Sequence, residues 1–477
     1  DAFARRTGDL RVPTFTVDGL ARDRVGNSAS QADGGALGAS RVWQDGYLGA
    51  SVDTYRNDYG VVVEPDVTIR MKRDRGAVAG EWRALDGPIS TVRAQLAYTD
   101  YRHQEVEGDG AVGTTFRSQG GDARLELVQR ARPLAGGQLD GAWGAQLEQL
   151  RFSALGEEAF VPGTRTGQQA LFGLQRWSLG RALHVSAGLR AEQVRVASDG
   201  DADGATPRFG AAQQRRFHPW SASVELGGAL AEGWEASASL ASTRRAPTFY
   251  ELYADGVHAA TAAYERGDPA QQLERGHQLD LGLAWRQGPH EARLTLFRNQ
   301  FANYIALAAT GQQVSTDEGD TVPVYAFGGV PARLWGWELE GRWQAWAGRD
   351  QALTLTAQAD AVRGVRSDTG EALPRLAPWR LSVGADWRDG AWSLGLTAQH
   401  AATQSRVDAQ DSPTPGWTQL HLNTRWQTRW AGHDAVLFAR LGNLGDTLAR
   451  SASAIATVRA LSPLPGRSLS AGVRLAL

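Results

Sequence analysis

The sequence predicts an all-β protein, a transmembrane antiparallel β-barrel of about 22 strands, and three observations support this prediction. Apolar and polar residues alternate along long segments of the chain. The connections between these segments are in turn short and long. The apolar–polar alternation continues to the last residue. The 477 residues include no apolar run of the length that a transmembrane helix needs. Only helices and closed barrels satisfy their own backbone hydrogen bonds in lipid, so a membrane location requires a barrel.

The clearest alternation lies in residues 379–388, where Trp379, Leu381, Val383 and Trp387 share one face and charged or small residues share the other. The same period of two occurs in four further segments, 278–286, 334–345, 351–361 and 391–400. A period of two over about ten residues corresponds to a strand of membrane length, whereas soluble sandwiches use strands of about 5–6 residues. We therefore expect Trp337, Leu355 and Val383 to face lipid, and the Trp residues at either end to lie in two interfacial girdles.

The connections between these segments fall into two classes. Short turns are expected at 231–233, 285–289, 347–350 and 388–390. Long polar stretches are expected at 103–114, 152–167, 197–216, 244–276, 306–332, 363–378, 401–416 and 443–466. Bacterial barrels have short periplasmic turns and long extracellular loops. The segments account for roughly 18–20 strands, so the prediction allows for the first strand or two to be missing.

The chain ends inside an alternating strand. Leu469, Ala471, Val473, Leu475 and Leu477 share one face. A terminal apolar strand leaves an unpaired edge unless it closes a sheet.

Composition excludes several classes of function. The absence of cysteine rules out disulfides and thiolate metal sites. A net charge of −2 argues against a nucleic-acid partner. The 56 glycines and 17 tryptophans fit the bends and the interfacial girdles of a barrel. We find no phosphate-binding loop, Ser-His-Asp order or paired catalytic carboxylates, so an enzyme is not expected.

Residues 244–286 resemble the most characteristic stretch of TonB-dependent receptor barrels. The matching positions are Arg245-Ala246-Pro247, Glu251-Leu252-Tyr253, Gly267-Asp268-Pro269, Glu274 and Asp280. Further matching segments are 98–107, 152–166, 374–379, 412–418, 440–446 and 464–467. The resemblance extends over nearly the whole chain. It implies an outer-membrane receptor of a Gram-negative bacterium that takes up a scarce nutrient by active transport.

Within this family the sequence is most similar to the zinc-uptake branch, through 152–166 and through Ala254-Asp255-Gly256-Val257-His258. The resemblance implies a plug domain and a TonB box before the barrel, and neither is visible here. Residues 1–36 are therefore expected to be an early barrel or loop segment that follows a missing plug, and 37–477 to be the barrel. The implied partners are outer-membrane lipid, the transported ligand and, through the missing N-terminal region, the TonB–ExbB–ExbD complex; we expect a monomer.

Zinc without cysteine requires histidine or carboxylate ligands. His103, Glu105 and Glu107 are spaced two apart, so in an extended chain they share a face. His258 lies in the long stretch 244–276. These four residues are the predicted metal ligands, and the resemblance favours His258 with Glu105 or Glu107.

Other cargoes remain open at this point. Haem would need a loop histidine for its iron, and a ferric siderophore would favour aromatic and arginine loop residues such as Tyr250, Tyr264 and Arg266. The predicted ligand-loop residues are Asp255, Tyr253, Glu157 and Arg266, and the predicted lumen-facing residues are Glu338, Glu340, Arg342, Asp360 and Asp386. No catalytic cofactor is expected.

Two functions of other classes compete with an active transporter. A barrel without a plug would be a passive, porin-like channel with a water-filled lumen. A soluble β-rich binding protein or enzyme would dissolve without detergent, and would bury the apolar faces in a globular core.

Overall fold

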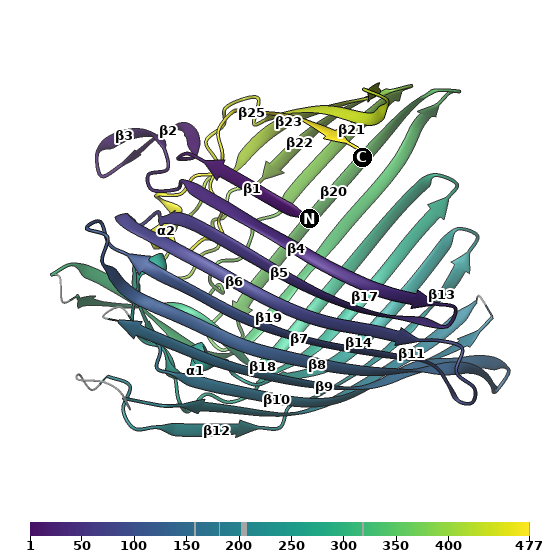
Figure 1. The fold of residues 1–477 in the computed structure, drawn as a ribbon, viewed down its shortest axis with the longest axis horizontal. Coiled ribbons are helices and arrows are strands. Elements are labelled where there is room, and N and C mark those ends of the chain that lie inside the picture. Colours follow the sequence, from purple (N-terminus) through teal and green to yellow (C-terminus); the bar gives the residue numbers. More distant parts are fainter. Residues whose placement is uncertain (157–158, 181, 202–207, 317–318, 477) are drawn as a thin grey trace.

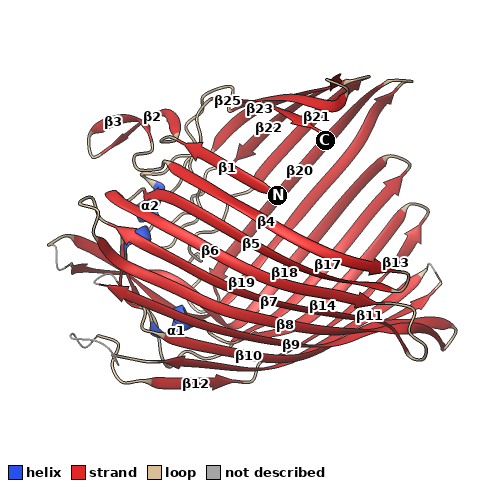
Figure 2. Ribbon diagram, in the orientation of Figure 1, coloured by secondary structure: helices blue, strands red, loops and turns tan. Residues whose placement is uncertain are grey.

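A computed structural model shows an almost entirely β protein, and it describes residues 1–156, 159–180, 182–201, 208–316 and 319–476. Within these ranges a single sheet contains 23 strands, and a separate hairpin contains two more. The sheet curves round so that β4 to β10 form a near wall with the strands from β14 to β20 behind it (Figure 1). Helices are confined to short pieces in the loops (Figure 2). Among the described residues no helix has the length and apolarity to cross a membrane.

Each strand of the wall pairs antiparallel with its neighbour along the chain. The first half comprises β1 (Ala2–Thr7), β4 (Ser30–Trp43), β5 (Gly46–Val61), β6 (Glu64–Trp82), β7 (Ile89–Val106), β8 (Val112–Leu134), β9 (Gly137–Gly156), β10 (Thr164–Leu179) and β11 (Leu183–Ser198). The second half comprises β12 (Gln213–Phe217), β13 (Trp220–Ala231), β14 (Trp234–Arg245), β17 (Glu274–Gln287), β18 (His290–Ser315), β19 (Thr321–Ala347), β20 (Gln351–Arg366), β21 (Arg380–Asp389), β22 (Trp392–Ala401), β23 (Trp417–Trp430), β24 (His433–Gly442) and β25 (Ser468–Leu475).

Twenty of these strands make up the wall within the described residues. Of the 23 in the sheet, β15 (Asp255–His258) and β16 (Ala263–Arg266) lie in a loop, and β12 and β13 pair with the two halves of β11 as one interrupted strand. The interruption contains Pro219, which has no backbone N–H for a ladder. The prediction of a large antiparallel barrel, with about 22 strands less one or two, is confirmed.

The two ends of the barrel differ as the sequence predicts. The turn end carries short connections, such as those between β13 and β14 and between β21 and β22. The opposite end, which we call the loop end, carries the remaining small elements: β2 (Arg11–Val17), β3 (Leu20–Arg24), α1 (Phe249–Tyr253), β15, the 3₁₀ helix η1 (Ala259–Thr261), β16 and α2 (Ala456–Arg459). Figure 1 shows α1 and α2 together at this end, on the left.

Two of the predicted long loops are largely strand. The stretch 306–332 continues β18 to Ser315 and resumes in β19 at Thr321, and 103–114 narrows to a turn between Val106 and Val112. These two hairpins project past the region where side chains alternate between lipid and lumen, so their polar composition resembles that of a loop. The other predicted long loops stand at the loop end.

The faces of the wall are assigned by burial. Trp337 is 36%, Leu355 42% and Val383 43% exposed, so none of the three lies in a globular core. On the same strands Ala332 is completely buried beneath the loops, and it shares its face with Glu338 and Glu340. From Ala332 to Gln344, the even-numbered residues of β19 therefore face inward, and the apolar residues that alternate with them face the lipid side.

The N-terminal hairpin meets the segment before the last strand of the wall at the loop end. The backbone N–H of Gly466, just before β25, donates to the carbonyl of Arg11 at 2.9 Å. The hairpin β2–β3 packs there through Val12, Phe15 and Val25, with Leu448 against them. The expected division at residue 36 falls inside β4, which is continuous from Ser30 to Trp43. The assignment of the first 36 residues stays a prediction.

Candidate functional site

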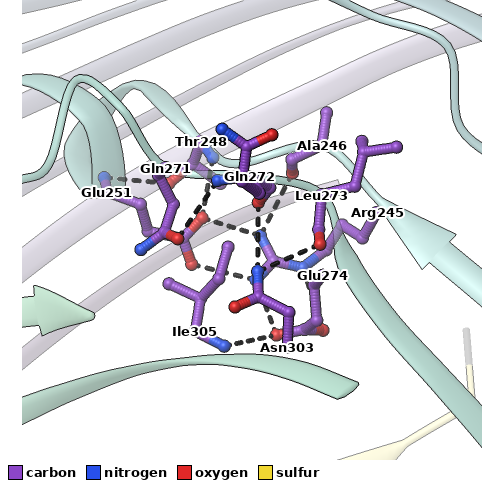
Figure 3. A network of polar contacts seen from close by, with 10 residues as sticks. All are labelled: Arg245, Ala246, Thr248, Glu251, Gln271, Gln272, Leu273, Glu274, Asn303 and Ile305. Atoms are coloured by element: carbon purple, nitrogen blue, oxygen red, sulfur yellow. Dashed lines mark hydrogen bonds and ion pairs between the residues drawn. The ribbon is translucent and has the colours of Figure 1, made fainter. Parts of the chain in front are cut away.

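The loop between β14 and β17 folds back over the loop end and is fastened by one arginine. Arg245, the last residue of β14, donates from Nη1 to Glu251 Oε2 at 2.8 Å and from Nη2 to Glu251 Oε1 at 3.0 Å. It also donates to Glu274 Oε1 and Oε2 at 3.3 and 3.1 Å. Figure 3 shows the guanidinium between the two carboxylates, with Asn303 and Ile305 of β18 beside them. Charge-assisted, two-pronged contacts of this kind fix orientation, so both ends of the loop are held together.

The first element of that loop is the short helix α1. Thr248 and Glu251 form a capping box: the Glu251 N–H donates to Thr248 Oγ1 and the Thr248 N–H donates to Glu251 Oε2. Two of the otherwise unsatisfied N–H groups of the helix start are thereby paired. Because Glu251 also accepts from Arg245, the cap fixes the direction in which α1 leaves the wall (Figure 3).

Four aromatic and histidine rings form a continuous stack beneath α1. His103 stacks on Phe116 with ring centroids 4.5 Å apart, Phe116 lies 6.2 Å from Phe160, and Phe160 stacks on His258 at 4.2 Å. Tyr250 of α1 lies 6.0 Å from Phe160. We call these five residues the aromatic–histidine cluster. They come from β7, β8, the connection before β10, and the loop between β14 and β17.

The cluster rests on a buried apolar core. Phe152, Val194, Val196, Phe249 and Leu252 belong to it, and Val196 and Leu252 are completely buried. Burial of this much apolar surface is the main force that holds the loop inside the wall. The cluster is therefore attached to packed, inward-facing residues of the wall.

His258 is oriented by a carboxylate. Its Nδ1 lies 2.9 Å from Glu265 Oε1, and Thr261 Oγ1 donates to the same oxygen at 3.1 Å. In the neutral imidazole, a proton on Nδ1 donated to this carboxylate leaves the lone pair on Nε2. Histidines that bind metals are commonly held in this way by a second group.

His103 carries a buried nitrogen without a partner. Its Nδ1 makes no hydrogen bond within the described part of the chain. The ring lies between Tyr101, at 5.6 Å, and Phe116. An unsatisfied buried polar atom has a free-energy cost, which a ligand at this position would relieve.

Two tyrosines of the loop stay protonated over a wide pH range. Burial, together with the Glu265 charge, raises the pKa of Tyr250. Burial and a 2.9 Å hydrogen bond that its hydroxyl donates to Asp255 raise the pKa of Tyr264 to about 12. Both phenols are therefore neutral hydrogen-bond groups near neutral pH.

The predicted metal ligands are only partly brought together. His103 and Glu105 share the inner face of β7, but Glu107 lies beyond the end of β7 in a turn. His103 and His258 belong to one cluster, separated by Phe116 and Phe160. Across the described ranges, no group of three or more histidine, aspartate or glutamate side chains is placed to hold a metal ion. Contact between any of the four and cargo stays a prediction.

The predicted ligand-loop residues have different surroundings. Asp255 accepts from Tyr264, and its N–H donates to the Phe160 carbonyl at 2.8 Å. Tyr253 is 5% exposed and packs into the apolar core. Arg266 is exposed and lies 5.8 Å over the Tyr264 ring. Glu157 lies outside the described residues.

The predicted lumen-facing residues lie on the inner face. Glu340 is 4.0 Å from Arg293 of β18, and both line a cleft of about 580 Å³ that also includes Arg342. Asp360 accepts from Arg380 of β21 at 3.0 Å. Glu338 and Asp386 are exposed on the same inner face. Two of the five predicted lumen-facing residues, Glu340 and Asp360, thus contact an arginine on a neighbouring strand.

Other loops tie into the cluster. Thr457 of α2 donates to the Thr261 carbonyl at 2.5 Å, which joins residues 196 positions apart. Arg208 donates to the Ala159 carbonyl at 2.8 Å. Arg459 forms a buried ion pair with Asp411, which joins two further loops. The β16 strand pairs parallel with β19, through Tyr264 and Val324 among others. The loop end is therefore a connected cap.

Several members of the site are absent from the sequence-based prediction. Phe116 is the direct cross-strand partner of His103, and that register cannot be read from one sequence. Phe160 lies in the segment 152–166, which carries part of the family resemblance, and the sequence-based prediction does not include Glu265. Alternation could have placed Phe116 on an inner face, but not beside His103.

This arrangement can bind a flat or aromatic ligand and offer it a nitrogen. The half-buried Tyr250 ring, packed on the buried Phe160, provides apolar contact area. His258 Nε2 provides a directed ligand atom for a metal, and neutral tyrosines provide hydrogen bonds.

Comparisons with known proteins agree with this architecture. The family described as "TonB dependent receptor-like, beta-barrel" matches residues 7–444. Among solved structures, the copper transporter OprC has a TM-score of 0.80 at 16% identity, covering 99% of this chain and 77% of that one. A hemophore receptor HasR of Serratia marcescens, solved with its hemophore HasA and heme, has a TM-score of 0.71 at 14% identity and covers 99% and 75%.

A ferric enterobactin receptor of Pseudomonas aeruginosa has a TM-score of 0.71 at 18% identity, covering 98% of this chain and 71% of that one. These likenesses show the fold. Among curated proteins, the Heme/hemopexin utilization protein C of Haemophilus influenzae strain 86-028NP is 26% identical over 186 residues, 36% of this chain. That match spans about a quarter of the relative's length, 26%.

Proposed function

This chain belongs to the TonB dependent receptor-like β-barrel family, and we propose that it is the barrel of an outer-membrane receptor of a Gram-negative bacterium. Its cargo is a metal carried in an organic chelate, with haem as the first candidate. Uptake is energised by the TonB–ExbB–ExbD complex through a plug and TonB box. The receptor acts as a monomer, and no catalytic cofactor or reaction is part of this function.

The observation that carries the proposal is the aromatic–histidine cluster. A planar chelate needs a face on which to stack, and the half-buried Tyr250 ring offers one, while Phe116 and Phe160, 5% and 3% exposed, support the cluster from beneath. Haem iron needs an axial ligand, and His258 presents Nε2 while Glu265 holds Nδ1. The relative whose name includes heme, and the solved neighbour with bound heme, support the same cargo class.

Other metal cargoes are distinguished by the same residues. A ferric siderophore would use the aromatic rings and Arg266 without coordination by His258. Zinc, the first cargo predicted from the sequence, would need about four ligands around one ion. Since no group of three ligands is assembled in the described residues, the zinc branch stays a prediction from the sequence.

A binding titration tests the proposal. The purified chain in detergent is titrated with haemin, with a ferric catechol chelate and with zinc, and binding is followed by visible absorbance and by tryptophan fluorescence. We expect haemin binding with a histidine–iron absorbance band, lost in His258→Ala. His290→Ala is the matched control, because His290 lies at the turn end stacked on Trp343.

Two results would contradict the proposal. Haemin affinity and absorbance that are the same in His258→Ala as in the unsubstituted chain would remove His258 from the site. A barrel that conducts ions steadily in bilayers when joined to its natural N-terminal region would instead indicate a passive channel.

A further inference from the structure

An ordered row of arginines lies on the lipid-facing side of the wall, close to the loop end. We call it the arginine row: Arg244 of β14, Arg275 of β17, Arg298 of β18, Arg333 of β19 and Arg363 of β20. Strand pairing aligns its members. Arg244 is the register partner of Arg275, and Trp335 is the partner of both Arg298 and Arg363. Register partners carry their side chains on the same face of a sheet.

The outward direction of the row follows from its neighbours. Arg245 and Glu274, adjacent in sequence to Arg244 and Arg275, point inward to each other. The positions that follow on the outer face towards the turn end include Leu240, 57% exposed, and Leu296, 44% exposed. The row therefore borders the apolar band that meets the lipid chains.

The row has no carboxylate partner in the described residues. Its members appear in no ion pair there, and the acids of these strands, including Glu274 and Glu338, lie on the inner face. Arg244 lies 4.2 Å over the Trp220 ring and Arg333 5.2 Å over the Trp335 ring. Stacking on tryptophan holds a guanidinium while leaving its N–H edge available.

The basic character continues on the next strands. Arg151, Arg165, Arg195 and Arg216 are exposed on β9 to β12, with Arg165 and Arg151 as one register pair and Arg195 and Arg216 as another. Among the described residues, Arg165 alone of these four has a carboxylate neighbour, Asp199 at 3.4 Å.

The opposite part of the wall is different at the same level. On β5 to β7 the outer arginines Arg56, Arg70 and Arg102 are interspersed with Asp58, Asp74 and Asp100. Lys72 pairs there with Asp74 at 2.6 Å, and Arg117 of β8 with Asp100 at 2.7 Å. The outer charge is thus balanced on one side of the barrel and unbalanced on the other.

We propose that the arginine row binds the phosphate groups of phosphorylated glycolipids in the surface leaflet of the membrane. Guanidinium groups match phosphate oxygens two at a time, and the apolar band beneath the row would contact the same lipid's acyl chains. The proposal rests on the proposed outer-membrane location. It does not depend on which cargo the receptor takes up.

The test compares two triple variants of the full chain. Arg298→Gln, Arg333→Gln and Arg363→Gln remove three charges of the row, and Arg56→Gln, Arg70→Gln and Arg102→Gln remove three from the balanced side. Each protein is refolded in detergent and mixed with a bisphosphorylated, acylated diglucosamine lipid, and bound lipid is measured by native mass spectrometry. We expect roughly a hundredfold weaker binding for the row variant and little change for the control.

Each outcome decides the proposal. Loss in the row variant only, together with no binding of the dephosphorylated glycolipid, supports it. The proposal is overturned if the unsubstituted protein and both variants bind the lipid equally, or if both variants lose binding equally. It is also overturned if inorganic pyrophosphate competes as well as the glycolipid itself. If the row variant fails to fold, Arg333→Gln alone is compared with Arg70→Gln. Haemin titration of the same samples separates this test from the proposed function, because cargo binding should be unchanged.

Discussion

At the loop end, the inner and outer faces of a single strand differ in burial and in charge. Val194 and Val196 of β11 are 6% and 0% exposed and belong to the core beneath the aromatic–histidine cluster. Arg195, between them, is exposed on the opposite face and pairs in register with Arg216. Inside, the wall supports rings and a histidine. Outside, it presents positive charge above an apolar band.

The alternation of side chains along a strand is therefore enough to separate the cargo-facing role of the wall from its lipid-facing role. Because successive side chains of a strand point to opposite faces, neighbouring residues can serve cargo and lipid independently. A substitution should therefore affect one function or the other according to its parity.

The largest effect should come from a charge placed on the lipid side. Val383, 43% exposed at the middle of β21, faces outward, and Ser382 faces inward. Val383→Arg should lower the free energy of unfolding by about 2–4 kcal/mol, since an outward arginine near the bilayer midplane is poorly solvated. Ser382→Arg should change it by less than about 1 kcal/mol. Denaturant titration of the barrel in lipid vesicles measures the free energy of unfolding of both variants. Equal losses of stability in the two variants would contradict the assignment of the two faces.

The next effect concerns the carboxylate that orients His258. Glu265→Gln removes the strong acceptor for Nδ1 while keeping the shape of the side chain. We expect haemin affinity to fall roughly 10–100-fold, the range typical of groups that orient metal ligands. Glu340→Gln, on the inner face but near the turn end, is the control. Unchanged affinity in Glu265→Gln would mean that His258 is not a ligand of the iron.

A smaller effect should follow from loosening the loop. Arg245→Ala leaves Glu251 and Glu274 without their shared partner. The Arg245 side chain is 42% exposed, so solvent screens part of the loss. We expect about 1.5 kcal/mol less local stability, and thus roughly tenfold faster amide exchange in 248–274. Arg333→Ala, outside the wall, should leave this exchange unchanged; acceleration throughout the barrel would contradict a local role.

The smallest effect is a pH dependence of the loop. Burial and the hydrogen bond to Asp255 raise the pKa of Tyr264 to about 12. The stabilisation is complete below pH 10, where the unfolded phenol is protonated, and it is lost as the pH rises from 10 to 12. Exchange in 255–266 should accelerate over this interval by more than the base catalysis common to all amides, and Tyr264→Phe should remove that excess. Ultraviolet difference spectroscopy measures the ionisation of Tyr264, and ionisation below pH 10 would contradict the raised pKa.

The wall could be predicted from the sequence because its signal is local. Trp337, Leu355 and Val383 all lie on the exposed outer face as alternation predicts. The loop end is less predictable, because the last residues of β18, up to Ser315, and the first of β19, from Thr321, have no lipid to impose alternation on their composition. Local composition there predicts a loop where backbone pairing makes strand.

The candidate site was predictable only in part. The capping box is visible in the spacing of Thr248 and Glu251, and His103 and His258 were both singled out. Their common cluster depends on the register of β7 against β8 and on the contact of Phe160 with His258. Such long-range contacts are set by packing of several segments, which one sequence does not encode in any local pattern.

The most direct test of the two-faced wall uses the absence of cysteine in the chain. Single cysteines are placed in turn at positions 381 to 386 of β21, and the barrel is folded into vesicles. We predict that a fluorophore at Leu381, Val383 and Ala385 is quenched by a lipid-bound quencher, and that one at Ser382, Gly384 and Asp386 is quenched by a water-soluble quencher. Quenching that does not alternate with position would contradict the account.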